Sequence, residues 1–325
     1  GDMAEASHLL AGGPRLWSEM KGEFEEKAAE IPVDNASVSA DDLKKVAKWL
    51  TQAITKLGAS ASVAEEADRD KALRPIADEV IKAYTAAVGT LLSLRRGAGK
   101  TLRLELRDAG AGLAAALDAL GKAIGSPAMA MNAGKVLDRV RQLERTSTHN
   151  RAALRRRILQ SLSTLRDAHR EFNEALKTED EDGEDDMDDG FDFDDTLDPA
   201  ERRIVEALAA SCTAMEDALK QASQVCMPSR APAAEKAGPG IPELEVASAN
   251  SATGVSAVDG LAVAVTGGLD VKAFEESLAE LRSAVGGLCS VSTALGAEAK
   301  VADDLQKTLE GVQEAFLAAQ KEDAK

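Results

Sequence analysis

Apolar side chains recur at steps of three and four residues along most of this chain. That spacing places them on one face of an α-helix, whereas a strand would need them at every second residue. No segment between turn signals shows strand-like alternation rich in Val, Ile, Thr and Tyr. We therefore predict an all-α protein, whose apolar stripes lie at 16–24, 43–57, 73–91, 102–120, 136–143, 154–176, 204–225, 255–265, 274–295 and 301–316.

The predicted core is built from small and medium aliphatic residues. Aromatic residues make up 3% of the chain and the hydrophobic fraction is 44%. Ala and Leu faces suit closely packed helices, and every amphipathic face needs a partner surface. We expect about nine helices in two antiparallel four- or five-helix bundles, formed by residues 1–130 and 131–325.

Two segments interrupt the helical pattern. Residues 179–198 hold 13 Asp or Glu and no Lys or Arg, so they account for most of the net charge of -17. Self-repelling charge with little apolar surface cannot offset the entropy of ordering, so we expect a disordered insert at 179–197. A Pro- and Ala-rich stretch predicts a flexible linker at 228–242.

Two sequence features suggest where the protein is found. Cys212, Cys226 and Cys289 show no C-x-x-C spacing, so we interpret them as reduced thiols. No segment approaches the roughly 20 uninterrupted apolar residues that span a bilayer, and the start lacks a basic segment followed by an apolar run. We expect a soluble protein of the cytoplasm and nucleus, without membrane contact.

Basic residues gather in two places despite the acidic composition. Arg96, Lys100, Arg103 and Arg107 are spaced four, three and four apart and line one face if the helix begins early enough. A solvated face is the commoner arrangement, and a partner-binding stripe is the alternative. Six arginines precede the acidic tract, which could fold back and screen them: Arg151, Arg155, Arg156, Arg157, Arg166 and Arg170.

The acidic tract contains two phenylalanines, Phe191 and Phe193, in a chain that has six. A purely solvating tract needs no aromatic residue, so a short recognition motif is the alternative to inert solvation. A calcium loop is excluded, because Met187 and Thr196 would stand at ligand positions.

No enzyme site is predicted. The segment 95–101 resembles the end of a phosphate-binding loop, but Leu94 replaces the first glycine and a helix precedes it where a strand is required. His8, His149 and His169 are scattered, and a neighbouring helix more often satisfies a histidine such as His169 than uses it as a catalytic base. We expect no catalytic residue, metal or cofactor, and the lack of interleaved aromatics argues against nucleic-acid binding.

The order of features from Val136 onward is distinctive. An apolar helix is followed by a polar break at 146–150, a long helix containing 165–171, the acidic insert, and the helix start Asp198-Pro199-Ala200-Glu201. This order resembles the cyclin-D-binding protein family, also described as Grap- and cyclin-D-interacting proteins. Segments 99–103 and 256–261 are similar to the family too, and the resemblance covers most of 43–289.

The resemblance implies two helical bundle domains and a non-enzymatic role. Family members are described as helix-loop-helix-type regulators that lack a DNA-contacting basic region, bind D-type cyclins and restrain cell-cycle transcription. Our first hypothesis is therefore a regulatory protein whose partners are cyclin D-like or helix-loop-helix proteins, with Phe191, Phe193, Arg96, Lys100, Arg103, Arg107, Arg151 and Arg155 as candidate binding residues. The rival hypothesis is a cytoskeletal scaffold of the vinculin and talin type, which also uses Ala- and Leu-rich helical bundles.

Overall fold

The computed structural model describes residues 4–25, 38–64, 69–177, 197–227, 240–265, 269–294 and 299–323. Every regular element in these ranges is an α-helix, labelled α1 to α11, which confirms the all-α prediction. The chain divides into two compact units, Gly1–Ala153 and Leu154–Lys325. None of the helices in the described ranges is apolar over a stretch long enough to traverse a lipid bilayer.

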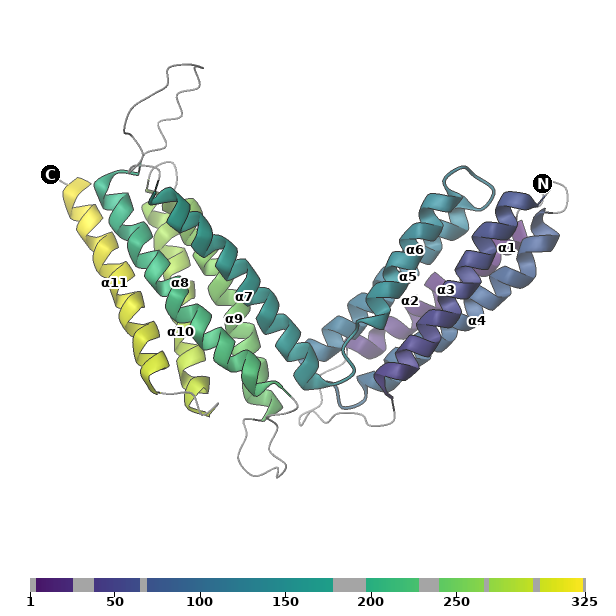
Figure 1. Ribbon diagram of the computed structural model, residues 1–325, viewed down its shortest axis with the longest axis horizontal. Helices are drawn as coiled ribbons and strands as arrows, with labels where there is room; N and C mark the ends of the chain where they lie inside the picture. Colours follow the sequence, from purple (N-terminus) through teal and green to yellow (C-terminus); the bar gives the residue numbers. More distant parts are fainter. Residues whose placement is uncertain are drawn as a thin grey trace, which may run out of the picture. The chain divides into compact units, whose positions relative to one another are not determined.

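Unit 1 is a bundle with five helical positions (Figure 1). Its helices are α1 (Ala4–Leu10), α2 (Gly12–Glu25), α3 (Ala40–Val63), α4 (Arg69–Arg95), α5 (Lys100–Ala123) and α6 (Met129–Glu144). Helix α3 packs on α4 and α6, α6 packs on α5, and the short helices α1 and α2 both lie against α4 and α5. Together α1 and α2 occupy the fifth position and close the ring.

Helix α6 belongs to unit 1, not to the second bundle. Its side chains Val136, Val140 and Leu143 are buried in the core of that unit. The expected division between residues 130 and 131 therefore falls one helix before the division in the structure. The turn that follows α5 reverses the chain so that α6 packs back on α5 and α3.

Unit 2 is also a five-helix bundle. Its helices are α7 (Asn150–Ala175), α8 (Pro199–Val225), α9 (Ile241–Val265), α10 (Val271–Ala294) and α11 (Ala299–Asp323). Helices α8 to α11 contact one another in a ring, and α7 adds one apolar face to the same core. The first four residues of α7, 150–153, count with unit 1, so the division lies inside this helix.

Capping boxes open α3 and α8, and the second confirms the helix start predicted at Asp198. The Asp42 backbone N–H donates to Ser39 Oγ at 3.3 Å and the Ser39 N–H donates to Asp42 Oδ2 at 2.9 Å, which opens α3. Asp198 Oδ1 accepts from the Glu201 N–H at 2.7 Å, and Glu201 Oε2 accepts from the Asp198 N–H at 3.0 Å, which opens α8. Each box satisfies two backbone donors that the helix leaves unpaired.

The helices in the described residues are more numerous than the expected nine, and α9 is longer than expected. Helix α1 has no counterpart in the prediction, because Gly12 and Gly13 resemble a turn. Helix α9 begins at Ile241, inside the predicted linker 228–242, and extends well before the predicted helix 255–265. Its first half is rich in Ala and Ser, so it lacks the large apolar residues that reveal helical periodicity. Residues 178–196 and 228–239, where the disordered insert and most of the linker were expected, lie outside the described residues.

Candidate functional site

The first predicted basic group lies at the start of α5, but only part of it is helical. Helix α5 begins at Lys100, with Gly99 as its N-cap. Arg96 therefore lies in the preceding turn, next to Gly97, whose φ of 79° is left-handed. The expected four-residue stripe is reduced to three residues on α5, namely Lys100, Arg103 and Arg107.

The three helical residues differ in exposure. Lys100 is exposed, whereas Arg103 and Arg107 are partly buried. Arg107 also donates through Nη2 to Asp108 Oδ1 at 3.1 Å, which neutralises part of its charge locally. Arg96 in the turn is exposed as well. The exposed positive charge of this group is therefore concentrated at the amino end of α5.

The buried side chain of Asn150 fixes the start of α7 to the start of α5. Its Oδ1 accepts from the Gly99 N–H at 2.7 Å, and its Nδ2 donates to the Gly97 carbonyl at 3.3 Å. Asn150 is 1% exposed. The predicted break between α6 and α7 is present, but this asparagine holds another loop instead of only capping its own helix.

A second contact fastens the same loop. The Ser147 N–H donates to Glu105 Oε1 at 2.8 Å, which joins the α6–α7 connection to α5. Lys100 and Arg151, from the two predicted basic groups, therefore begin helices whose ends are held together in unit 1. Arg151 and Arg155 are both partly buried, and Arg155 follows one turn later, past the division between the units. Phe191 and Phe193 lie outside the described residues.

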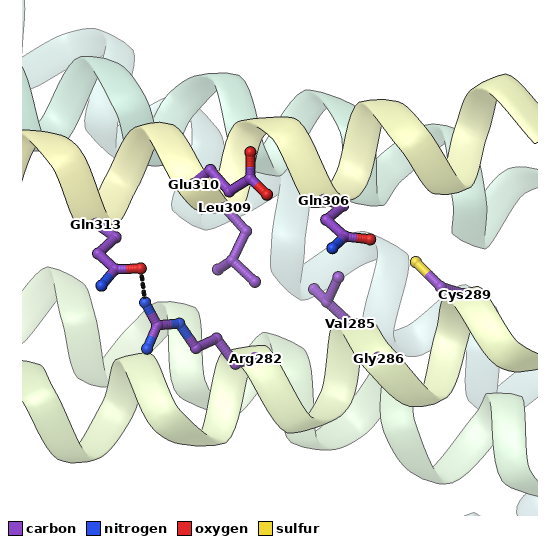
Figure 2. A pocket seen from close by; sticks show the side chains of 8 residues that line it. All are labelled: Arg282, Val285, Gly286, Cys289, Gln306, Leu309, Glu310 and Gln313. Atoms are coloured by element: carbon purple, nitrogen blue, oxygen red, sulfur yellow. Dashed lines mark hydrogen bonds between the residues drawn. The ribbon is translucent and has the colours of Figure 1, made fainter.

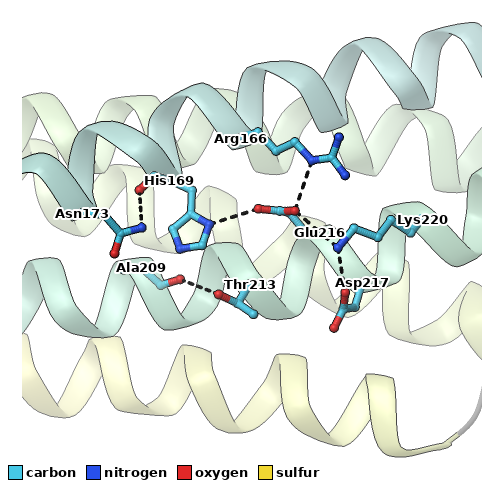
Figure 3. Close-up of polar contacts among 8 residues, drawn as sticks. All are labelled: Arg166, His169, Asn173, Ala209, Thr213, Glu216, Asp217 and Lys220. Carbon is cyan, nitrogen blue, oxygen red and sulfur yellow. Dashed lines mark hydrogen bonds and ion pairs between the residues drawn. The ribbon is translucent and has the colours of Figure 1, made fainter.

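Glu216 of α8 contacts Arg166 of the second basic group, together with His169 and Lys220 (Figure 3). Its Oε2 lies 3.2 Å from Arg166 Nε and 3.4 Å from Lys220 Nζ, and its Oε1 lies 3.0 Å from His169 Nδ1. The prediction that a neighbouring helix satisfies His169 is thus confirmed. Arg170 pairs with Asp167 and Glu174 of its own helix. Arg166 and Arg170 therefore already have acidic partners within unit 2.

The Glu216 cluster joins α7 to α8 electrostatically. Burial alone would raise the pKa of the Glu216 carboxyl, but hydrogen bonds from His169, Arg166 and Lys220 outweigh burial and lower it. The side chain is 13% exposed, so these charge-assisted contacts are only partly screened by solvent. The cluster has the character of a structural contact between two helices.

A shallow groove of about 380 Å³ lies between α10 and α11 (Figure 2). Val285 and Leu309 form its apolar part, and Arg282 and Gln313 bridge it with a hydrogen bond. Cys289 lines one end, and its thiol contacts the Ala302 carbonyl at 3.6 Å. Burial and the nearby Asp303 raise the pKa of this thiol, so it is protonated at neutral pH and a poor nucleophile.

Side chains that could bind a metal ion are not clustered in the described part of the chain. No group of three or more His, Cys, Asp or Glu there is arranged to hold a metal ion. Cys212 is a buried free thiol, and burial raises its pKa to about 12.

Sequence reasoning missed the two residues that organise these contacts. Asn150 lies in the predicted polar break, but its partners are 51 and 53 residues away. Glu216 lies 47 residues from His169, and nothing in its local sequence distinguishes it from other acidic residues on helices. Only a signal that pairs distant positions could have found either one.

Part of the chain is similar to a known protein family. Residues 42–178 match the family model described as Grap2 and cyclin-D-interacting, N-terminal. The match runs from the first turn of α3 to just beyond α7, and it confirms the resemblance noted in the sequence. No curated protein matches the chain with significant similarity. All six basic candidate residues lie inside the matched region, whereas Phe191 and Phe193 lie outside it.

Proposed function

Because residues 42–178 match the N-terminal region of the Grap2- and cyclin-D-interacting family, we propose that this protein is a non-enzymatic regulator that acts by binding other proteins. This match is the observation that carries the proposal. We further propose that its partners are cyclin D-like or helix-loop-helix proteins. Its role would be to restrain cell-cycle progression or transcription in the nucleus and cytoplasm.

The joined starts of α5 and α7 are the surface that best supports partner binding in the matched region. Lys100 and Arg96 are exposed there, and the Asn150 contacts fix the backbone that carries them. A rigid surface loses little conformational freedom on binding. Because the surface is positively charged, it suits an acidic patch on a partner, and association should weaken as ionic strength rises.

Capture of a purified D-type cyclin by the chain of residues 1–325 tests this proposal. The double variant Arg96→Glu/Lys100→Glu reverses two exposed charges at the joined helix ends and should weaken capture by at least about tenfold. The matched control, Lys272→Glu/Lys321→Glu, makes the same change in charge at exposed positions of unit 2 and should leave capture unchanged.

A second comparison uses a version that lacks residues 179–195, in a pull-down from a lysate of the source organism. Recovery of cyclins or transcription regulators by the intact protein supports the proposal, and their loss on deletion would place the contact in the acidic tract. Recovery of actin-linked proteins, with no binding of purified cyclin, would contradict it and favour a cytoskeletal scaffold.

A further inference from the structure

Helices α1 and α2 fill a groove between α4 and α5. The partly buried Leu9 and Leu16 pack beside five buried residues and the partly buried Met20, which are spaced alternately four and three apart: Ala6, Leu10, Gly13, Trp17, Met20 and Phe24. That spacing is the one by which a helix presents a narrow apolar seam to neighbouring helices. The segment therefore docks on α4 and α5 in the way that an amphipathic helix from another protein could dock.

The groove is shaped by two glycines of α5. A Cβ atom at Gly110 would lie 2.2 Å from the Trp17 ring, so only glycine leaves room for the indole. A Cβ atom at Gly121 would lie 3.2 Å from Leu10 Cβ, and the Ser7 hydroxyl donates to the Gly121 carbonyl at 2.9 Å. The α5 surface is thus recessed at the positions where a bulky apolar side chain enters.

Charged contacts hold the two ends of the segment. Arg95 Nη2 lies 2.6 Å from Glu23 Oε2 at the end of α2, and Arg74 Nη1 lies 2.9 Å from Glu5 Oε2 in α1. The Glu5 and Arg74 side chains are 58% and 62% exposed, so their ion pair adds little stability. The segment is therefore anchored mainly by its apolar seam.

One buried polar atom is left without a partner at the centre of the segment. The helix breaks at Ala11, between α1 and α2. A Cβ atom at Gly13 would lie 3.4 Å from Tyr84 Cε1, an ordinary van der Waals distance, so the start of α2 lies close to this tyrosine. The Tyr84 hydroxyl is fully buried and has no hydrogen-bond partner among the described residues. A buried hydroxyl without a partner is destabilising, so α1 and α2 leave this polar atom of the groove unsatisfied.

The match to the family model includes the two helices that form the groove but not the segment that fills it. Helices α4 and α5, with Tyr84, Gly110 and Gly121, lie inside the matched region 42–178, whereas α1 and α2 lie outside it. The family region thus contributes the groove, and a segment outside that region covers it.

We propose that the groove between α4 and α5 is a helix-binding site that α1 and α2 cover as a displaceable segment. Its external occupant is an amphipathic helix of a partner protein, with apolar residues alternately three and four apart and a bulky aromatic residue at the position of Trp17. This proposal rests on the proposed function, because it names one place where a protein partner binds. Displacement of α1 and α2 would be the step that such binding requires.

Fluorescence anisotropy of a labelled peptide of residues 4–25 tests the site in the chain of residues 1–325. The peptide can bind only those molecules in which α1 and α2 have left the groove. Its apparent affinity therefore falls as the fraction of covered molecules rises. Trp17→Ala in the protein weakens the covering segment, so the peptide should bind this variant at least about tenfold tighter than the wild type. Gly12→Ala meets no atom within 4 Å and favours the helical segment, so it should weaken peptide binding about threefold or more.

The variant Gly110→Ala tests whether the peptide binds in the groove between α4 and α5. The added methyl group occupies the space of the indole, so it should loosen α1 and α2 without any gain in peptide binding. A peptide carrying Trp17→Ala should lose binding to every variant. If Trp17→Ala in the protein gives no tighter binding, or if Gly110→Ala gives the same gain, the groove is not the site and the proposal is wrong.

Hydrogen exchange of the wild-type protein supplies an independent measurement. Amides of α1 and α2 should exchange well before those of α5, and Trp17→Ala should accelerate only the former. Equal protection of α1, α2 and α5 would overturn the proposal. None of these measurements uses a cyclin, so a failure to capture cyclin would count against the proposed function alone, and a failure to bind the peptide would count against the groove alone.

Discussion

Tyr84 is the residue whose substitution is most informative about the core of unit 1. Its hydroxyl is buried without a hydrogen-bond partner among the described residues. Tyr84→Phe removes this polar atom and keeps the ring, so we expect the free energy of unfolding to rise by about 1 kcal/mol. Urea unfolding at pH 7 measures the change. A loss of stability would mean that the hydroxyl is hydrogen-bonded in solution.

The stability of the protein at alkaline pH tests the burial of the Tyr84 phenol in a second way. Its titration can be followed directly, because Tyr84 is the chain's single tyrosine. Burial raises the pKa of its phenol in the folded state. The unfolded chain titrates near pH 10, so the stability linked to this group is complete below about pH 10 and is lost as pH rises further. The phenolate absorbance should therefore appear only together with unfolding, and Tyr84→Phe should remove this part of the alkaline loss.

Glu216 should control the acid side of the stability profile. Its folded-state pKa is lowered, so its contribution is present above its ordinary value of 4.5 and is lost as pH falls through the folded-state value. We expect Glu216→Gln to cost about 1 kcal/mol at pH 7, a modest value because its partners are partly solvated, and to flatten the loss of stability below about pH 4.5.

Asp217→Asn is the matched control for Glu216→Gln. Asp217 is the next residue of α8, its side chain is 60% exposed, and it pairs with Lys220 at 3.0 Å. The thermal unfolding temperature of this variant should match that of the wild type both at pH 7 and below about pH 4.5. If the two substitutions have equal effects, the α7–α8 cluster is not a stabilising contact.

Between elements, the close approach of α2 to α5 depends on a missing side chain. Gly110→Ala would place a methyl group against the rigid Trp17 ring, and we expect a loss of about 1–3 kcal/mol despite the better helix propensity of alanine. Gly89→Ala in the neighbouring helix α4 is the control, because no atom lies within 4 Å of the added Cβ. It should gain up to about 1 kcal/mol in chemical denaturation, and a similar gain for Gly110→Ala would contradict the packing described here.

A helix could be predicted from the sequence where its buried face carries large aliphatic side chains. Helices with Leu, Ile or Val stripes, such as α3, α5 and α8, were predicted from their spacing. The first half of α9 was not, because its buried residues include Ala247, Ser248 and Ser251, which do not register as apolar. Helix propensity and periodicity depend on the local sequence, whereas the packing of α9 depends on α10. A Cβ atom at Gly254 of α9 would lie 3.4 Å from Ala284 Cβ of α10.

The candidate site was less predictable than the fold. The basic residues could be named from the sequence, because charge type and spacing are local properties. Their joint placement could not, since it depends on one buried amide, Asn150, whose partners are far away in the chain. The predicted stripe was wrong at Arg96, because Gly97 is in a left-handed conformation and α5 begins three residues later, at Lys100.

At the scale of the whole molecule, the two units raise the question of where the chain can be divided. The sequence favoured residue 130, because a Gly-Ser-Pro turn ends the helix before it. The structure instead places α6 against α3 and α5, with Val136, Val140 and Leu143 fully or almost fully buried. A fragment that ends at residue 130 would expose the apolar faces that these side chains cover. It would also lack the Asn150 contacts to the α4–α5 turn.

We therefore expect the fragment 1–153 to fold independently and the fragment 1–130 to fail. The fragment 1–153 retains α1 to α6 and Asn150, so circular dichroism should show high helicity and one cooperative thermal transition. The fragment 1–130 loses the burial of three aliphatic side chains, each contributing about 1.5–3 kcal/mol, which is comparable to the whole stability of a small domain. It should melt without a sharp transition or aggregate. A cooperative transition in 1–130 at the same temperature would show that α6 is dispensable, and that the division of the molecule lies where the sequence placed it.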